Sequence, residues 1–451
     1  MSSSMSKKKI KLSDQHAPNC DDSSCRGCDI GEIEVKFTSE DGKEKIKLTP
    51  VELFQIALEE SSKVVEQDIG IVKRLFDLAL EGFESLLVKE KENKREEKDK
   101  EKEEEEEEKR RKNKGKKREL EEVNTTSNKQ TRYQYALCCI AFGIYLPLVE
   151  QIKKGVDILK EIIAEDADFY EGWMELGRGM FALTCTERKL KSRGEEEEEE
   201  DSDDDSEKEY NSISKNEFNN YTFGMNAFSK GLSILKLKDK TNYVEETIRA
   251  VKDLQDYGIL INNIKPFDHA KTIFTKSINY LEDAYNNLEP EIINENKLFQ
   301  GMWGSCLYYI SKLKSRETQG TKEVLEVLDL AIEKLLFTND TESLGKNLFK
   351  EILGQAYLFK STVENDDDQA IKAFDKGVEY LLETYNEDKG NDNLRKQLET
   401  LGVLTDNNNN DESEKKDEYR NEDENEDEEG EYRDEDEEGE YRDEDDEDED
   451  E

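Results

Sequence analysis

The residues best suited to bind a metal ion lie near the start of the chain. His16, Cys20, Cys25 and Cys28 form the pattern H-x3-C-x4-C-x2-C. Imidazole and thiolate are the usual ligands of tetrahedral zinc, but this spacing is irregular for a zinc finger, so free thiols stay an alternative to a zinc site. An iron–sulfur loop would need a fourth nearby cysteine, and the next is Cys138. We expect no cofactor.

Residues for acid–base or nucleophilic catalysis are scarce in the rest of the chain. The only other histidine is His269, which therefore lacks histidine partners. Cys138, Cys139, Cys185 and Cys306 fall on apolar helical faces and are expected to be small core residues. No glycine-rich phosphate loop, nucleophile elbow or HExxH motif is present. We therefore expect a binding protein rather than an enzyme.

Two serines in an acidic run are candidates for phosphorylation. Ser202 and Ser206 are each followed by an acid three residues later, the pattern that acidophilic kinases select. Phosphate there would deepen a negative patch and tighten the binding of a basic partner. The alternative is an unmodified, solvated loop.

The charge of the chain restricts its partners. Residues 411–451 contain 28 Asp and Glu against 5 Lys and Arg, a net charge of −23 within a total of −46. Self-repulsion and the lack of apolar side chains predict that residues 401–451 form a disordered acidic tail. Such a tail repels nucleic acid and attracts basic proteins such as histones, or it simply keeps the chain soluble. We expect no direct nucleic-acid binding.

Short basic runs and the lack of long apolar runs bear on location. Residues 7–11 and 109–118 resemble nuclear import signals, which a nuclear import receptor would bind. The second run can also be the solvated face of a charged helix, because Glu and Lys alternate over residues 89–108. Seven cysteines fit a reducing compartment. No apolar run is long enough to be a signal peptide or to cross a membrane. We expect an intracellular protein of the nucleus, with the cytoplasm as a second location.

Helical repeat motifs recur along the chain and must position any binding site. Trp173, Leu176 and Gly177 belong to a W-x2-L-G-x2-M segment, one residue away from a tetratricopeptide first-helix motif. Further copies include Trp303, the first-helix match Leu353, Gly354 and Tyr357, and the second-helix residues Ala370 and Phe374. Within each copy a small residue lets two helices approach, and a large one fills the groove beside it. No hairpin can bury its apolar stripe alone, so neighbours must stack, and the ends should fray first.

The spacing of these motifs predicts an all-α fold of about six helical hairpins in a tetratricopeptide-like right-handed superhelix. Residues 1–48 form a polar segment with a small β-hairpin between residues 33–37 and 45–48, and residues 49–400 form the helical-repeat domain. Thr49 and Pro50 provide the signal that starts its first helix. Charged insertions at about 89–125 and 190–212 are expected to be disordered.

Four segments resemble the fungal family of enhancers of translation termination, which includes the nuclear negative regulator of a prolyl-hydroxylase-like oxygenase. These are residues 53–58, 74–83, 133–138 and 168–177, and the likeness in order and hairpin phasing covers residues 49–385. The resemblance implies an all-α nuclear adaptor without catalytic residues. Such an adaptor promotes stop-codon recognition together with termination factors, and restrains an iron and 2-oxoglutarate oxygenase by binding it.

A histone chaperone is the alternative function. In that class, acidic insertions interrupt a tetratricopeptide stack and neutralise histone charge. The acidic tail and the run around Ser202 favour it, whereas the first insertion is nearly as basic as it is acidic.

Overall fold

The structure is a computed structural model that describes residues 48–63, 67–108, 119–198, 212–288, 293–317, 321–338 and 346–404. Over these ranges it contains thirteen helices and no strand, which confirms the all-α prediction. The helices are α1 (Pro50–Ser61), α2 (Ile69–Glu108), α3 (Glu119–Tyr145), α4 (Val149–Glu165), α5 (Tyr170–Glu198), α7 (Lys215–Lys238), α8 (Lys240–Ile261), α9 (Asp268–Asn287), α11 (Lys297–Glu317), α12 (Thr321–Leu336), α13 (Lys346–Val363), α14 (Asp367–Glu387) and α15 (Asp392–Thr400). The expected hairpin of residues 33–37 and 45–48 lies almost wholly outside the described residues.

The first helix begins where the sequence signal predicts. The Oγ1 of Thr49 accepts a hydrogen bond from the backbone N–H of Glu52 at 3.3 Å, and Glu52 Oε2 accepts from the backbone N–H of Thr49 at 2.8 Å. Pro50 occupies the first turn, where its missing N–H has no partner to lose. This reciprocal capping box satisfies two backbone donors that the helix itself leaves open.

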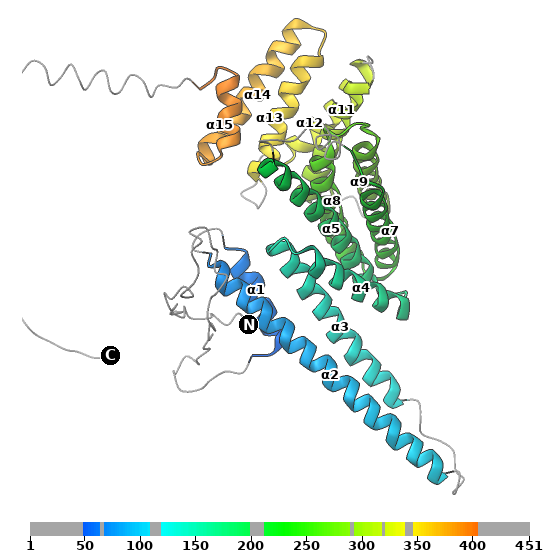
Figure 1. Ribbon diagram of the computed structural model, residues 1–451. Coiled ribbons are helices and arrows are strands. Elements are labelled where there is room, and N and C mark those ends of the chain that lie inside the picture. The colour runs from blue at the N-terminus through cyan, green and yellow to red at the C-terminus, as the bar shows by residue number, and fades with distance from the viewer. Residues whose placement is uncertain are drawn as a thin grey trace, which may run out of the picture. The chain divides into compact units, whose positions relative to one another are not determined.

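Helices α1 to α14 pack as consecutive pairs, which Figure 1 shows in chain order. Within the described residues the pairs are α1 with α2, α3 with α4, α5 with α7, α8 with α9, α11 with α12 and α13 with α14. The second helix of each pair also contacts the first helix of the next pair. Each element is therefore packed mainly against its neighbours in sequence, as in a helical-repeat solenoid.

Close approach within a pair depends on small residues at two of the predicted positions. A Cβ placed on Gly177 of α5 would lie 2.5 Å from the ring of Phe228 on α7. One placed on Gly354 of α13 would lie 2.8 Å from the side chain of Leu381 on α14. Both glycines thus face the large side chain that fills the groove opposite, as the motif predicts.

The apolar core is continuous along the later pairs and divided at the earlier ones. One cluster of buried side chains runs from α5 to α14, while two smaller clusters join α1, α2 and α3, and α3, α4 and α5. Helix α11 is central to the large cluster, because every residue from Phe299 to Tyr308 is buried. A helix that is buried on all sides is suited to serve as the core of its neighbours.

The charged insertions contain more helix than expected. Helix α2 continues through Glu108, α3 already begins at Glu119, and α5 continues through Glu198. The prediction of disorder across about 89–125 and 190–212 is therefore wrong for these parts. Glu, Lys and Arg are good helix formers, and opposite charges four residues apart support a helix without an apolar stripe. Residues 109–118, including their basic run, and residues 199–211 lie outside the described part of the chain.

The chain divides into two compact units at Glu387 and Asp388. Helix α15 thus belongs to the second unit, whereas we expected a repeat domain that ends at residue 400. Asn391 caps α15 by accepting from the N–H of Leu394 at 3.1 Å. The helix ends with Gly402 at φ +71°, where Val403 N–H donates to the carbonyl of Leu398 at 3.0 Å. This is a Schellman ending, which favours glycine. The expected tail beyond residue 404 lies outside the described residues.

Candidate functional site

The first helices of successive pairs contact one another in a continuous series. Helix α1 contacts α3, α3 contacts α5, α5 contacts α8, α8 contacts α11, and α11 contacts α13. Successive second helices approach less closely by their backbones in the described part of the chain, although side chains join α7 to α9, as in the ion pair of Lys236 and Asp283. The first helices therefore form a row, and residues far apart in sequence meet along it.

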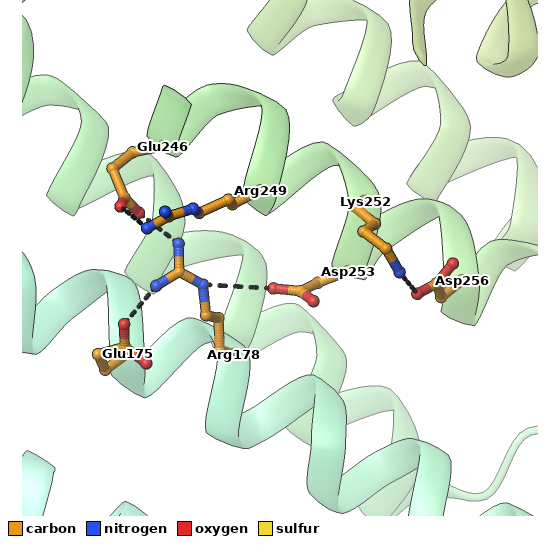
Figure 2. Close-up of polar contacts among 7 residues, drawn as sticks. All are labelled: Glu175, Arg178, Glu246, Arg249, Lys252, Asp253 and Asp256. Carbon is orange, nitrogen blue, oxygen red and sulfur yellow. Dashed lines mark hydrogen bonds and ion pairs between the residues drawn. The ribbon is translucent and has the colours of Figure 1, made fainter. Parts of the chain in front are cut away.

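A cluster of charged side chains lies where α5 meets α8 in this row, as Figure 2 shows. Arg178 of α5 donates from its two terminal nitrogens, one to Glu175 on its own helix and one to Glu246 of α8. The Nε of Arg178 lies 3.7 Å from Oδ2 of Asp253, which follows Glu246 on α8 by about two turns. We call Glu175, Arg178, Glu246 and Asp253 the Arg178 cluster.

Three carboxylates thus surround one guanidinium in the Arg178 cluster. The exposed fractions are 19% for the Arg178 side chain, 24% for Glu175 and 15% for Glu246, so these groups are largely shielded from water. Arg249, 60% exposed, pairs with Glu246 at 2.9 Å from the solvent side. Arg178 holds the carboxylates of the cluster together. Because Arg249 is exposed and its ion pair is weak in water, the cluster keeps an excess of negative charge.

Burial and neighbouring charge change the ionisation of the cluster. Burial raises the pKa of Asp253 to about 7, with Arg178 opposing and Asp256 adding to the increase. Burial also raises the pKa of Glu175, against the attraction of Arg178. For Arg178 itself, burial lowers the pKa, but Glu175 and Glu246 outweigh it and the net direction is upward. The arginine therefore stays charged, and Asp253 is the group of the cluster that exchanges a proton near neutral pH.

Tyrosines on the adjoining first helices α3 and α11 experience the charges of nearby acids. Burial, then the charges of Glu175 and Glu171, raise the pKa of Tyr133 on α3. On α11, burial, then the charge of Glu351 on α13, raise the pKa of Tyr309 to about 12, and Asp256 adds to this.

A second ion pair, deeper in the fold, joins α5 to α7 and α8. Arg188 donates from Nε to Glu217 Oε1 at 2.5 Å and from Nη2 to Glu217 Oε2 at 2.6 Å, and both side chains are at most 9% exposed. Tyr257 of α8 donates to the same carboxylate at 2.8 Å, and Arg188 also donates to the carbonyl of Ser212 at 2.9 Å. These groups have their partners, so the pair has a structural rather than a reactive character.

The single histidine of the described chain has an aromatic and hydroxyl environment. Its Nδ1 lies 2.6 Å from the hydroxyl oxygen of Tyr221, and the ring of Phe218 packs edge-on at 5.7 Å. No group of three or more His, Cys, Asp or Glu side chains in the described part of the chain is placed to hold a metal ion. The His16, Cys20, Cys25 and Cys28 cluster lies outside the described residues.

The four described cysteines are in the reduced form and lie in the core, as the sequence predicts. Cys138, Cys139 and Cys306 are buried, and Cys185 is half-buried. Burial raises the pKa of Cys185 and of Cys306 to about 12. These thiols are therefore poor nucleophiles at neutral pH.

Most of the predicted repeat residues lie in the core, with three exceptions. Leu176, Trp303, Leu353 and Tyr357 are buried. Trp173, Ala370 and Phe374 are more exposed. The phosphorylation candidates Ser202 and Ser206 lie outside the described residues.

Trp173 is half-buried, and its indole N–H donates to the carbonyl of Ala167 at 2.9 Å. Ala370 is half-buried, and Phe374 is 38% exposed, so the expectation of a large core residue at position 374 is wrong. On α14 the buried side is formed instead by Ala373, Gly377 and Leu381, which lie four residues apart.

Sequence reasoning missed the Arg178 cluster, although its residues carried a weak signal. Arg178 directly follows the Gly177 motif, and Glu246, Arg249 and Asp253 recur at intervals of three and four on one helix. Such spacing usually indicates exposed ion pairs along a single helix. Only the contact between α5 and α8 shows that these charges surround one buried arginine.

Comparison with models of known protein families finds no match to this chain. Comparison with curated proteins finds no significant similarity either. No helix in the described ranges is long and apolar enough to span a membrane.

Proposed function

We propose that this chain is a protein-binding adaptor in which the row of first helices binds a polypeptide partner. The observation that carries the proposal is the series of contacts from α1 to α13, with the Arg178 cluster in it. Helices that touch along one side and separate along the other generate curvature, and the side of closer contact becomes the inner face. The proposed architecture is a tetratricopeptide-like right-handed superhelix with the first helices inside.

The resemblance of residues 53–58, 74–83, 133–138 and 168–177 supports a more specific role. We propose a nuclear adaptor without catalytic activity that promotes translation termination, restrains a prolyl-hydroxylase-like oxygenase by direct binding, or does both. The first three segments lie on α1, α2 and α3, and the fourth spans the start of α5, so they belong to three successive helix pairs. The partners on this proposal are termination factors or the oxygenase, together with a nuclear import receptor.

A histone chaperone is the second candidate, because the net charge of −23 over residues 411–451 favours a basic partner. The two candidates differ in how salt affects them. Binding through a flexible acidic tail is mostly long-range attraction, which salt screens within about a Debye length of 8 Å at physiological ionic strength. Binding along packed helices depends on contact and should persist at higher salt.

A pair of charge swaps tests whether the row of first helices is the contact face. Lys252 and Asp256 form an exposed ion pair at 2.6 Å on the first helix α8. Lys322 and Glu326 form an exposed pair of the same spacing, at 3.9 Å, on the second helix α12. One double variant combines Lys252→Asp with Asp256→Lys, and the other combines Lys322→Glu with Glu326→Lys. Both preserve the net charge and the spacing of the pair.

The assay is capture from nuclear extract by full-length immobilised protein, with the captured proteins quantified by mass spectrometry. We expect the swap on α8 to reduce recovery of an oxygenase or termination factors by about tenfold or more, since like charges facing each other cost several kcal/mol. The swap on α12 should leave recovery unchanged. Equal effects of the two swaps would exclude the row as the contact face. Capture of histones that are released as salt rises, with neither adaptor partner present, would favour the chaperone.

A further inference from the structure

The joint between α5 and α8 contains one more carboxylate than its arginine hydrogen-bonds. Arg178 uses its two terminal nitrogens for Glu175 and Glu246. Oδ2 of Asp253 is buried and accepts no hydrogen bond within the described residues, although the Nε of Arg178 is 3.7 Å away. The side chain of Asp253 as a whole is 31% exposed. One buried oxygen therefore carries charge without a donor.

An ionised carboxylate oxygen in this position is unfavourable, because it has lost water and gained no hydrogen bond. Addition of a proton removes the charge and converts the group into a donor that neighbouring carboxylates can accept. Two carboxylates that share one site commonly resolve their repulsion in this way. Burial accordingly raises the pKa of Asp253 to about 7 and raises that of Glu175 in the same direction.

The charges that act on Asp253 come from α5 and from α8 itself. Helix α5 supplies Arg178, Glu175 and the half-buried thiol of Cys185. On α8 itself the neighbours are Lys252 and Asp256, which pair with each other.

The remaining packed helices add no free countercharge at this point. Glu217 of α7 is bound to Arg188, and Tyr309 of α11 interacts with Asp256. Helix α9 packs on another side of α8, where Phe274 lies against Gly258. Arg178 is thus the principal cation of the site, and it is shared by three acids.

We propose that the joint between α5 and α8 is a proton-binding site, in which Asp253, beside Arg178 and Glu175, holds a proton whose release weakens the contact between the two helices. The site belongs to the described fold and does not depend on any partner. In the row of first helices, it makes the packing of the third pair against the fourth sensitive to pH.

The direction of the pH effect follows from the folded and unfolded states. In the folded chain Asp253 holds its proton up to about pH 7, whereas the ordinary value is 3.8. Between these values unfolding releases a proton, so stability falls as pH rises from about 4 to 7 and is then constant for this group. The carboxylate is thus least favourable above pH 7.

The test is the thermal midpoint of unfolding of the full chain at pH 5.5 to 8.5, for the natural protein and for Asp253→Asn. The amide keeps the size of the side chain and cannot ionise. We expect the midpoint of the natural protein to fall by about 2–4 °C more than that of the variant across this range, with the extra fall complete by about pH 7 and no further difference above it. Glu326→Gln, which removes an exposed charge on α12 that does not act on Asp253, should follow the natural protein.

Parallel pH curves for the natural protein and Asp253→Asn would overturn the proposal. If Asp253→Asn does not fold, Glu175→Gln gives the second test. This change leaves Arg178 more available to Asp253, so the pH-dependent fall in the midpoint should move to lower pH. An unchanged pH curve for Glu175→Gln would also overturn the proposal.

Discussion

The two tryptophans of the chain lie on first helices but differ in burial. Trp303 is 7% exposed and lies in the large apolar cluster, where Tyr285 and Phe299 pack against its ring. Trp173 is half-buried and packs against the smaller cluster of α3 to α5. The same residue type therefore contributes differently at the two positions, and a measurement can separate them.

We predict that Trp303→Ala costs about 3–5 kcal/mol of unfolding free energy, the range for loss of a buried aromatic side chain. Trp173→Ala should cost clearly less, because its ring is already partly in contact with water. Urea unfolding followed by circular dichroism measures both. The single-tryptophan variants Trp173→Phe and Trp303→Phe supply the check: emission from Trp303 should lie at shorter wavelength than emission from Trp173. The reverse order in either experiment contradicts the assigned burial.

Gly177 supports a second prediction at this scale. Ala is the better helix former by about 1 kcal/mol, so Gly177→Ala would stabilise an exposed helix. Here the added methyl would lie 2.5 Å from the ring of Phe228, and we expect a net loss of about 1–3 kcal/mol. Chemical denaturation measures it, with Asn219→Ala on the exposed side of α7 as a control that should change little. A stabilised Gly177→Ala variant would show that α5 and α7 can separate without cost.

At the scale of the element, α5, α7 and α8 are joined by the pair of Arg188 and Glu217 with Tyr257. We predict that Glu217→Ala lowers the unfolding free energy by about 3–5 kcal/mol, because it leaves Arg188 buried without its carboxylate. The double variant Arg188→Met with Glu217→Leu should recover much of that loss, since no buried charge remains.

The control for this prediction is Asp256→Ala, which breaks an exposed pair and should cost less than about 1 kcal/mol. Denaturant unfolding compares all three variants. If Glu217→Ala costs no more than Asp256→Ala, the buried pair does not hold the three helices together. Arg188 also binds the carbonyl of Ser212, so the pair holds the residues that lead directly into α7.

At the scale of the whole described fold, burial is unequal along the series of pairs. Helix α11 is enclosed by α8, α9, α12 and α13, whereas α1 contacts only α2 and, more weakly, α3. In a repeat stack each pair is stabilised by its neighbours, so an end pair has fewer stabilising contacts than a central one.

We therefore predict that amide hydrogens of α1 exchange first and those of α11 last. Hydrogen exchange with mass spectrometry at several sub-denaturing urea concentrations gives the opening free energy of each helix. We expect α1 to open well below the global value and α11 to open only with global unfolding. Equal opening free energies for α1 and α11 would indicate a single cooperative unit instead of a stack.

The sequence by itself determined the element types and their pairing. Apolar residues at intervals of three and four and small residues beside large ones specified the helices, and Thr49 with Pro50 specified where the first one begins. These signals are local, because capping, periodicity and close approach each depend on residues within a few turns. The charged run after Leu87 carries two opposing signals: its low hydrophobicity favours disorder, whereas the spacing of its Glu and Lys residues favours a helix. The structure has a helix through Glu108, so the prediction of disorder was wrong there.

Only the tertiary structure decided how the charges are arranged. Arg178 and Glu246 are 68 residues apart, and nothing in either local sequence indicates that they meet. The exposure of Phe374 depends in the same way on how α14 packs on α13. Helical periodicity fixes which residues share a face, but the contact between faces depends on the geometry of packing between helices. That geometry surrounds one arginine with three carboxylates and creates the candidate site.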